Sequence, residues 1–556
     1  MTAEPTRDEL RDQAQTWLDD DPDPMTRAEL AAVLRHADAG QAAALADLAD
    51  RFDGTLEFGT AGLRGAIGAG PNRMNRSVVI RAAAGLTAYL RQASPAPRVV
   101  IGYDARHRSA DFAHDTAAVV VAAGGEALLL PSALPTPVLA FAVRHLAADA
   151  GVMVTASHNP PQDNGYKVYL GDGRQIVPPA DADISASIAA VGPVRQVPRV
   201  DGGWHVLGDD LLEAYLQAAA AVVDEHAPRD LSVVHTPLHG VGRDVVLAAF
   251  ERAGFAPPYV VPSQAEPDPD FPTVAFPNPE EPGAIDAALA AAAERQADLV
   301  IANDPDADRC AVAVPLPAGG WRMLTGDEVG VLLGAHLISR GVEPDAVFAS
   351  SIVSGRLLAA VCAASGVRHV ETLTGFKWIA RVPGLRYGYE EALGYCVDPT
   401  SVRDKDGVSA ALLMAELAAS CKSDGRTLLD LLDDRSRAHG VHLTGQVSVR
   451  VTDLALIAEA MRRLRSSPPA AFGDVRVGSC DDLLEGGDGL PPTDGLRYSL
   501  EDGSRVVVRP SGTEPKLKAY LEVVVAVAGE LSSAAAEAER RLEALRAAVR
   551  AAVGLG

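Results

Sequence analysis

Short apolar runs alternate with longer helical patterns through most of the chain. The runs typical of buried strands form three successive groups, at 98–102, 127–130 and 152–154, then at 231–234 and 298–301, and then at 345–348 and 369–371. Alanine-rich stretches with helical spacing separate them. Three such rounds predict three related α/β domains rather than one very large sheet.

The two ends of the chain have different patterns. Residues 6–50 are helical in pattern, and Thr26 and Glu29 are spaced as a capping box. From about residue 440, short alternating strands at 442–444 and 447–449 surround helices, and a helix rich in Ala, Glu and Arg covers 530–552. The C-terminal part is therefore predicted to be a separate α+β domain.

Breaks in composition at 191–203 and 315–320 predict two linkers. With the patterns above, they divide the chain into a helical extension, three α/β domains and the C-terminal domain. The predicted boundaries are 1–50, 51–203, 204–316, 317–438 and 439–556.

Composition narrows the class of protein. With 48% hydrophobic and 22% charged residues over 556 positions, the chain suits a soluble protein of several domains. Its net charge of -24 disfavours nucleic acid and anionic membranes as partners, because both would be repelled. Five scattered cysteines without a Cys-x-x-Cys motif predict a reducing cytoplasm rather than disulfides or a thiolate metal site. We expect neither a secretory signal nor a membrane span.

The first candidate for chemistry is Ser157, within Thr-Ala-Ser-His-Asn-Pro at 155–160. The preceding apolar run predicts a strand, and Asn159-Pro160 ends it, so the serine should lie on a bend at the carboxyl edge of a sheet. A capping serine in a turn is the plainer interpretation, and the glycines of a hydrolase nucleophile elbow are absent. Lys167 follows ten residues later and adds a cation.

Asp304, Asp306 and Asp308 follow another apolar run. Three carboxylates at a spacing of two can converge on a hard cation such as Mg²⁺, and Arg309 would balance their charge or reach a phosphate. The acidic stretch at 19–23 follows no such strand, and we interpret it as turn and capping residues.

The third candidate is the loop at 509–516, Arg-Pro-Ser-Gly-Thr-Glu-Pro-Lys. Its successive backbone N–H groups, two hydroxyls and one guanidinium suit a phosphate monoester. The loop lacks the spacing of a nucleotide-binding P-loop. Softer candidates are the glycine-rich loop at 58–65, the Asp–Arg pair at 104–106, and the polar loops at 375–378 and 389–395.

Together these motifs resemble the α-D-phosphohexomutase superfamily, which includes phosphoglucomutases and phosphomannomutases. The resemblance runs from about residue 40 to the C-terminus, with five motifs in the superfamily's order, at 59–65, 155–160, 304–309, 389–395 and 509–518. It implies an α/β fold of four domains around a central cleft. Three would be related mixed α/β sandwiches, and the C-terminal α+β domain would be similar to the TATA-binding protein.

The resemblance also implies a role for each motif. Ser157 would be the phosphoserine that carries the transferred group, and it would join Asp304, Asp306 and Asp308 in holding one Mg²⁺. Lys167 is the candidate general acid or base, and the catalytic set also includes Arg64 and His158, the latter shaping the loop or contacting phosphate. The residues expected to bind substrate are Arg309, Lys377, Glu390, Glu391, Lys405, Arg509, Ser511, Gly512 and Thr513.

The implied reaction interconverts hexose 1-phosphate and hexose 6-phosphate, with glucose preferred, through a 1,6-bisphosphate that also serves as primer. Ala392 stands where many members carry a serine, so one hydroxyl contact to the hexose is missing or replaced. This form of the loop is similar to a subgroup that includes phosphoglucomutases, sugar-bisphosphate synthases and phosphopentomutases. Phosphomannomutase and phosphopentomutase are alternatives, and a sugar phosphatase is a distant one. The expected partner is a phosphorylated monosaccharide, bound by a monomer or homodimer.

Overall fold

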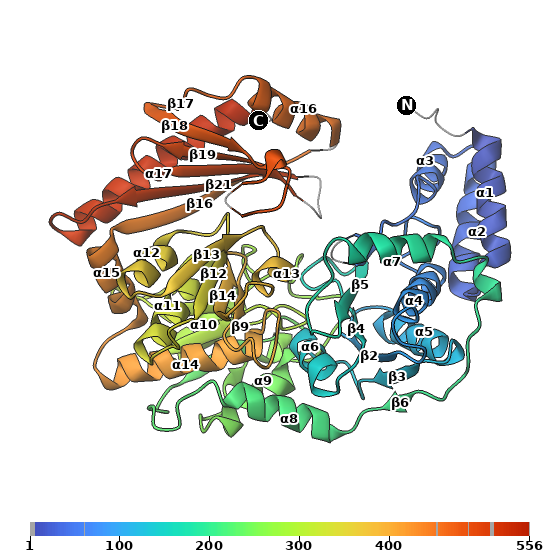
Figure 1. The fold of residues 1–556 in the computed structure, drawn as a ribbon, viewed down its shortest axis with the longest axis horizontal. Coiled ribbons are helices and arrows are strands. Elements are labelled where there is room, and N and C mark those ends of the chain that lie inside the picture. The colour runs from blue at the N-terminus through green and yellow to red at the C-terminus, as the bar shows by residue number, and fades with distance from the viewer. Residues whose placement is uncertain (1–5, 60–61, 452–453, 488, 512–515, 555–556) are drawn as a thin grey trace. The chain divides into compact units, whose positions relative to one another are not determined.

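The computed structural model of the protein describes residues 6–59, 62–451, 454–487, 489–511 and 516–554 (Figure 1). Within these residues the chain forms two compact units. The first comprises residues 6–323 and 394–419, and the second comprises residues 324–393 and 420–554. Among the described helices, none combines the length and apolar character needed to cross a membrane.

Three helices begin the first unit, namely α1 (Arg7–Asp20), α2 (Pro24–Asp38) and α3 (Ala42–Arg51). They enclose a small apolar core around Leu10, Leu30 and Leu48. The acidic segment that joins α1 to α2 also contacts the rest of the unit, because Asp21 Oδ1 accepts a 2.9 Å hydrogen bond from the Ser77 hydroxyl. Helices therefore lie where the sequence pattern at 6–50 predicts them.

The capping box predicted at Thr26 and Glu29 is wrong. Helix α2 begins earlier, since Asp23 caps it through the Met25 N–H and Pro24 occupies its first position. The Thr26 hydroxyl instead donates to Asp21 Oδ2 at 2.6 Å. Glu29 forms an ion pair with Arg51.

The first sheet has the strand order β1-β5-β4-β2-β3-β6. Its strands are β1 (Leu63–Ala66), β2 (Arg98–Tyr103), β3 (Glu126–Leu129), β4 (Ala150–Val154), β5 (Asp163–Leu170) and β6 (His205–Val206). Strands β4, β2, β3 and β6 run parallel, whereas β5 is antiparallel to both β4 and β1. Arg64 on β1, the bend after β4 and Lys167 on β5 therefore come from neighbouring strands.

Helices cover both faces of this sheet. They are α4 (Arg76–Leu90), α5 (Ser109–Ala122), α6 (Thr136–His145) and α7 (Ala180–Ala189). Val99 and Ile101 of β2 share a core with α4, α5 and α7. Alternate residues of a strand face opposite sides, and on the other side a Cβ at Gly102 would stand 3.0 Å from Leu139 of α6. Helix α6 thus packs directly on the strands that lead to Ser157.

The second sheet has the order β11-β10-β9-β7-β8. Its strands are β7 (Val233–Thr236), β8 (Tyr259–Val260), β9 (Leu299–Ala302), β10 (Ala311–Pro315) and β11 (Trp321–Met323). The accompanying helices are α8 (Asp209–Ala220), α9 (Gly242–Arg252), α10 (Asp286–Arg295) and the 3-10 turn Pro262–Gln264. An earlier 3-10 turn, Val194–Gln196, packs on α4 and α5 of the first sheet. The segment 315–320, expected to be a linker, is the turn between the antiparallel strands β10 and β11. Its prolines and glycines suit a hairpin turn equally well.

Two further elements follow residue 393, namely β15 (Gly394–Cys396) and α14 (Gly407–Ser423), and residues up to 419 belong to the first unit. The second unit begins with a sheet in which β13 (Arg368–Thr372) and β14 (Leu385–Glu390) flank the parallel strand β12 (Val347–Ser351). Its helices are α11 (Gly326–Ser339), α12 (Leu357–Ala364), α13 (Phe376–Ile379) and α15 (Leu428–His439).

The last sheet has the order β16-β21-β20-β19-β18-β17, and its neighbouring strands run antiparallel. The strands are β16 (Val441–Arg450), β17 (Ala471–Phe472), β18 (Val475–Asp482), β19 (Leu496–Leu500), β20 (Arg505–Pro510) and β21 (Lys516–Val525). They lie with α16 (Leu454–Ser466), α17 (Leu531–Val553) and a 3-10 turn, Leu483–Glu485 (Figure 1). The two short strands expected at 442–444 and 447–449 are one strand, because Gly445 continues the ladder opposite Leu521.

Candidate active site

Ser157 lies on a tight bend three residues after the end of β4. Its φ of 52° is in the left-handed region, which residues other than glycine seldom adopt. The Thr155 hydroxyl accepts the backbone N–H of Ser157 at 2.8 Å and stabilises the bend. The bend predicted from the sequence is present, although Ser157 is only 3% exposed.

Arg106, which follows the end of β2, stabilises this bend through hydrogen bonds. Its guanidinium donates to the carbonyl of Ser157 at 2.6 Å, to that of Pro160 at 2.9 Å and to that of Asp163 at 3.2 Å. The side chain is fully buried, and Asp104 Oδ2 lies 3.4 Å from its Nε atom. The Asp–Arg pair noted in the sequence therefore has a positioning role.

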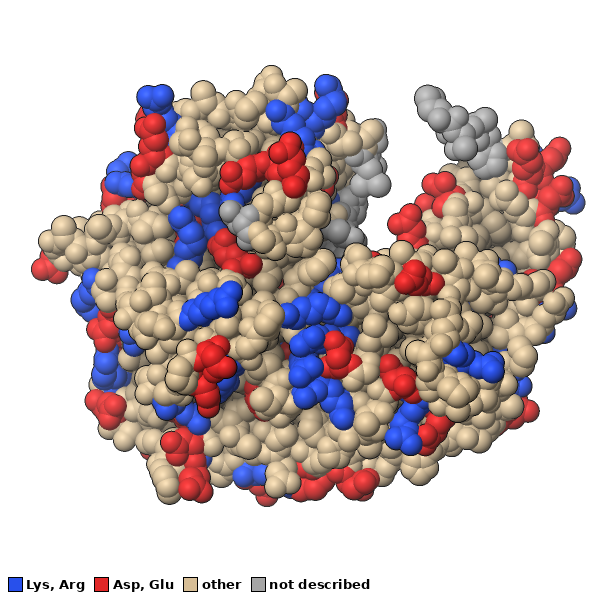
Figure 2. Space-filling view, in the orientation of Figure 1, with Lys and Arg blue, Asp and Glu red and all other residues tan. Residues whose placement is uncertain are grey.

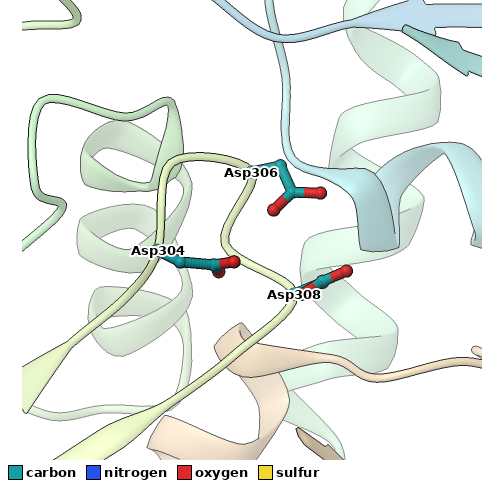
Figure 3. Close-up of side chains that lie close together, drawn as sticks. All are labelled: Asp304, Asp306 and Asp308. Atoms are coloured by element: carbon teal, nitrogen blue, oxygen red, sulfur yellow. The ribbon is translucent and has the colours of Figure 1, made fainter. Parts of the chain in front are cut away.

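The three aspartates lie on the loop between β9 and β10, and their carboxylates converge (Figure 3). One oxygen from each of Asp304, Asp306 and Asp308 lies within 4.8 Å of the others, and all three residues are buried. Ala307, at a φ of 52°, turns the loop back so that its N–H reaches the Asp304 carbonyl at 2.8 Å. The Ser157 hydroxyl donates to Asp304 Oδ2 at 2.6 Å. The two motifs thus form one site.

Two lysines partly neutralise the aspartates. Lys167 Nζ donates to Asp306 Oδ2 at 2.7 Å and to Asp308 Oδ2 at 3.0 Å. Lys405 Nζ lies 3.3 Å from Asp308 Oδ2. Burial opposes the charge on Lys167, but the two carboxylates outweigh it and raise its pKa.

The pKa values of Asp304 and Asp308 shift in opposite directions. Burial, reinforced by Asp306 and Asp308, raises the pKa of Asp304 well above its ordinary value. Burial also tends to raise the pKa of Asp308, but the charges of Lys167 and Lys405 outweigh this effect and lower the pKa of Asp308. The anionic charge is therefore concentrated on the side of the loop that faces the lysines.

Three other predicted residues surround the serine. His158 Nδ1 lies 3.2 Å from Ser157 Oγ, and burial together with Arg309 and Arg64 lowers the pKa of His158 well below its ordinary value. Arg64 donates to Asn159 Oδ1 at 3.1 Å. Arg309 Nε lies 3.7 Å from Asp304 Oδ2. The structure thus brings together every predicted site residue of the first unit.

The second unit holds the other predicted residues. Glu391 Oε2 accepts hydrogen bonds from the hydroxyls of Ser351 at 3.0 Å and Ser354 at 3.1 Å. Burial, with Glu390 beside it, raises the pKa of Glu391 to about 7. The close approach of Gly326 requires a glycine, since a Cβ there would stand 1.8 Å from the Glu391 carbonyl oxygen.

Tyr520 on β21 links these glutamates to the last sheet. Burial and the nearby Glu391 raise the pKa of its hydroxyl, which accepts a hydrogen bond from Arg509. Ser511 N–H donates to the Lys516 carbonyl at 2.8 Å, beside the ends of β20 and β21. Lys377 lies on the short helix α13. Gly512 and Thr513, also predicted to bind substrate, lie outside the described residues.

Comparison with known proteins identifies this arrangement. Models of the four phosphoglucomutase/phosphomannomutase domains match in order: α/β/α domain I at 55–194, α/β/α domain II at 213–317, α/β/α domain III at 325–438, and the C-terminal domain at 447–543. The chain belongs to the phosphoglucomutase/phosphomannomutase family. It is a phosphomutase of this type, with the four-domain α/β fold that the resemblance implied.

Named relatives of this phosphomutase differ in their substrates. A protein of Haemophilus influenzae named "Probable phosphomannomutase" is 48% identical over 81% of this chain and 93% of its own length. A Homo sapiens phosphopentomutase is 36% identical over 85% of each chain. The solved structure of pp63/parafusin from Paramecium, described as a phosphoglucomutase, superposes with a TM-score of 0.68 at 18% identity, over 89% of this chain and 95% of that one. These matches establish a family of sugar-phosphate mutases and leave the sugar open.

The aspartate loop of the phosphomutase fits a divalent cation. Asp306 Oδ1 and Asp308 Oδ1 are buried and have no hydrogen-bond partner among the described residues. Buried carboxylate oxygens without a donor are costly unless a cation or water meets them. An all-oxygen set of ligands suits Mg²⁺.

Sequence reasoning missed Thr136 in the first unit and Tyr520 in the second, and it gave Arg106 no role in the site. Thr136, at the start of α6, donates its hydroxyl to Asp306 Oδ2 at 2.6 Å, and its N–H donates to the Asp306 carbonyl. Arg106 was noticed only as half of a pair, and Tyr520 was not noticed at all. No local signal marks Thr136, because its partner lies 170 residues away in the sequence. None marks Tyr520 either, whose hydroxyl accepts from Arg509 and is affected by the charge of Glu391.

Proposed function

We propose that this phosphomutase interconverts α-D-glucose 1-phosphate and glucose 6-phosphate through a phosphoserine at Ser157 and a glucose 1,6-bisphosphate intermediate. One observation carries the proposal: the Ser157 hydroxyl donates at 2.6 Å to Asp304, inside a triad of buried carboxylates. A serine held against a cation site is suited to exchange a phosphoryl group.

The reaction consists of two transfers. In the first, the bond between phosphorus and Ser157 Oγ breaks as the sugar's free 6-hydroxyl oxygen bonds to phosphorus. The 6-hydroxyl gives its proton to a base, Ser157 Oγ takes up a proton as the leaving oxygen, and the product is the 1,6-bisphosphate. In the second, after the bisphosphate has turned over, Ser157 Oγ loses its proton and bonds to the phosphorus on the 1-oxygen. The bond between that phosphorus and the 1-oxygen breaks, and the 1-oxygen takes up a proton. The enzyme returns to its phosphorylated form, and the sugar leaves as the 6-phosphate.

The residues around Ser157 have complementary roles in this proposal. Lys167 is the candidate general acid or base for the sugar hydroxyl, because its Nζ lies among the aspartates next to the serine. Arg64 and Arg309 offset charge on the transferring oxygens. His158 shapes the bend through its 3.2 Å contact with Ser157 Oγ.

The cation proposed for the triad is Mg²⁺, one per chain, held by Asp304, Asp306, Asp308 and an oxygen of the phosphorylated Ser157. When bound, Mg²⁺ supplies positive charge to the phosphoryl oxygens. Arg106 and Thr136 hold the two loops that carry these ligands.

Other residues are proposed to bind the sugar phosphate. Glu390 and Glu391 would accept hydrogen bonds from sugar hydroxyls, and Lys377 and Lys405 would donate hydrogen bonds to the substrate. Arg509 and Ser511, with Gly512 and Thr513 of the same loop, would grip the phosphate that is not reacting. Retention of a bisphosphate by such a loop favours return transfer over hydrolysis, so a sugar phosphatase is disfavoured.

Phosphopentose is the second candidate substrate. Ala392 removes a hydroxyl where many family members have a serine, and a relative 36% identical is named a phosphopentomutase. Phosphomannomutase is the remaining alternative within the family. We also propose a cytoplasmic monomer or homodimer; all five cysteines are free thiols.

Intact-mass measurement tests the mechanism. The purified enzyme should carry one phosphate, which glucose 1-phosphate removes and which Ser157→Ala lacks. Full activity in Ser157→Ala would refute a phosphoserine intermediate. Ser185→Ala, at a serine on α7 in the same unit, serves as the matched control and should keep both the phosphate and the activity.

The substrate is tested by comparing kcat/KM for glucose 1-phosphate, mannose 1-phosphate and ribose 1-phosphate, each with its bisphosphate as primer. We expect the highest value for glucose 1-phosphate. A higher value for ribose 1-phosphate would replace glucose by pentose without affecting the phosphoserine mechanism.

A further inference from the structure

A tight turn after β5 brings three arginines together in the first unit. Arg174 lies on this turn. Arg144, near the end of α6, crosses it, because a Cβ at Gly173 would stand 2.6 Å from Arg144 Cγ and Cδ. Arg403, between β15 and α14, donates from Nη1 to the Asp172 carbonyl at 3.3 Å. Figure 2 shows Lys and Arg side chains gathered on this face over α6.

The three arginines have few anionic partners. Asp172 Oδ2 lies 3.3 Å from Arg174 Nη1 and is the one carboxylate that they contact among the described residues. Arg144 and Arg403 donate to backbone carbonyls, which carry no net charge. Arg174 Nε is buried and has no partner within the described part of the chain.

Other acidic groups nearby are already engaged. Asp398 accepts hydrogen bonds from Thr400 and Ser401, and Asp404 accepts them from the Tyr169 hydroxyl at 2.7 Å and Gln175 at 2.6 Å. Burial, followed by the charges of Arg144 and Arg174, lowers the pKa of Arg403. The three guanidinium groups therefore repel one another without full compensation.

We propose that Arg144, Arg174 and Arg403 form a binding site for the phosphate group of a small anionic metabolite, separate from the site around Ser157. Three planar guanidinium forks from three chain segments match the several oxygens of a phosphate. The anion would supply the missing negative charge and a partner for Arg174 Nε. Nucleic acid does not fit, because a protein with a net charge of -24 would repel it.

A very short segment, residues 403–405, runs from the proposed anion site to a contact with the aspartate loop. Arg403 is followed by Asp404, which is fixed by Tyr169, and then by Lys405, whose Nζ lies 3.3 Å from Asp308. An anion that holds Arg403 should therefore also restrain Lys405. The site goes beyond the proposed mutase reaction, because it contacts neither the transferring phosphoryl group nor the sugar.

Thermal unfolding in the presence of inorganic phosphate tests this site. Phosphate should raise the Tm of the wild-type enzyme, and Arg174→Ala/Arg403→Ala should lose at least half of that increase. The matched control is Arg243→Ala, whose side chain is 25% exposed, as is that of Arg174. The control should keep the wild-type shift, and an equal shift in the double variant would overturn the proposal.

Two further arms complete the test. A wild-type crystal soaked in phosphate should show an anion touching all three guanidinium groups, and an empty site would count against the proposal even if the double variant fails to fold. Repeating the titration with a phosphomonoester and with sulfate distinguishes the phosphate group of a metabolite from a free inorganic anion as the ligand. A metabolite site should give the phosphomonoester at least a tenfold lower Kd than inorganic phosphate, and only in enzymes that keep Arg174 and Arg403. Equal Kd values for the phosphomonoester and inorganic phosphate would mean that the site binds free phosphate and not a metabolite.

Discussion

The hydroxyl of Ser157 donates a 2.6 Å hydrogen bond to Asp304 although 147 residues separate the two. Each residue follows a strand of a different sheet, β4 and β9. Open α/β sheets place ligands beyond the carboxyl ends of their strands. The contact therefore joins two such edges, and it places a hydroxyl beside the carboxylate triad.

The triad should bind a divalent cation through all three carboxylates. Asp306→Asn keeps the shape of the side chain but removes its charge, so we expect at least a 100-fold loss of kcat. Mg²⁺ at 100 times its Kd should stabilise the wild type by about 2.7 kcal/mol, and it should stabilise the variant by much less. Titration of the Tm with Mg²⁺ measures this effect. Asp201→Asn, an exposed residue of the same unit, should behave as wild type. Equal Mg²⁺ responses in wild type and Asp306→Asn would contradict the assignment.

Arg106 should be needed for the position of Ser157 rather than for chemistry itself. Arg106→Leu removes hydrogen bonds to several carbonyls of the bend and leaves Asp104 buried without its cation. We expect a loss of about 3 kcal/mol in the free energy of unfolding, in the range for breaking a buried charge pair. The kcat should fall while the KM changes little.

Urea unfolding and steady-state kinetics measure the two effects. Arg106→Lys should recover part of the stability but little of the kcat, because one ammonium group cannot reach all the carbonyls that the guanidinium fork reaches. Arg98→Leu is the control, since Arg98 is 43% exposed and paired at the surface with Glu126. A normal kcat in Arg106→Leu would show that the bend holds without this arginine.

The catalytic motifs were visible in the sequence because their residues are contiguous. An apolar run followed by Ser157-His158-Asn159, or by the Asp-x-Asp-x-Asp cluster, carries both the strand and the side chains that the strand delivers. The three α/β modules and the separate C-terminal domain followed from the same periodicity.

The remaining contacts depend on tertiary structure. Thr136 reaches Asp306 across 170 residues of sequence, and Glu391 acts on Tyr520 from a similarly distant part of the chain, which no local pattern encodes. The Thr26 capping box failed because Asp23-Pro24 is a stronger helix start. The turn at 315–320 was interpreted as a linker because proline and glycine mark hairpins and linkers alike.

Gly407, at the start of α14, should be required for the geometry of the aspartate loop. A Cβ at this position would stand 2.3 Å from the Arg309 carbonyl oxygen and 2.7 Å from that of Ala307. Gly407→Ala must therefore displace backbone at Arg309 and Ala307, the residues on either side of Asp308. We expect at least a tenfold weaker Kd for Mg²⁺ and a loss of about 1–3 kcal/mol of stability, as overpacked sites show. Isothermal titration measures the Kd. Gly192→Ala, where nothing lies within 4 Å, should leave it unchanged, and an unchanged Kd in Gly407→Ala would contradict this interpretation.

Glu391 should make the stability of the enzyme depend on pH. Burial and the neighbouring Glu390 raise its pKa from 4.5 to about 7. A carboxyl with a raised pKa binds its proton more tightly in the folded state than in the unfolded state. Its favourable contribution is therefore complete below pH 4.5 and is lost as the pH rises through about 7. Because the side chain is partly exposed, about 3 kcal/mol is an upper limit for this loss.

Glu391→Gln should remove this dependence, because the amide does not titrate. The free energy of unfolding, measured in urea from pH 5 to pH 8, should therefore fall more steeply in the wild type than in the variant. Glu343→Gln, at an exposed position of the same unit, should keep the wild-type slope. Parallel curves for wild type and Glu391→Gln would mean that the Ser351 and Ser354 hydroxyls stabilise the carboxylate enough to offset its burial. In that case Glu391 would already be ionised at pH 6.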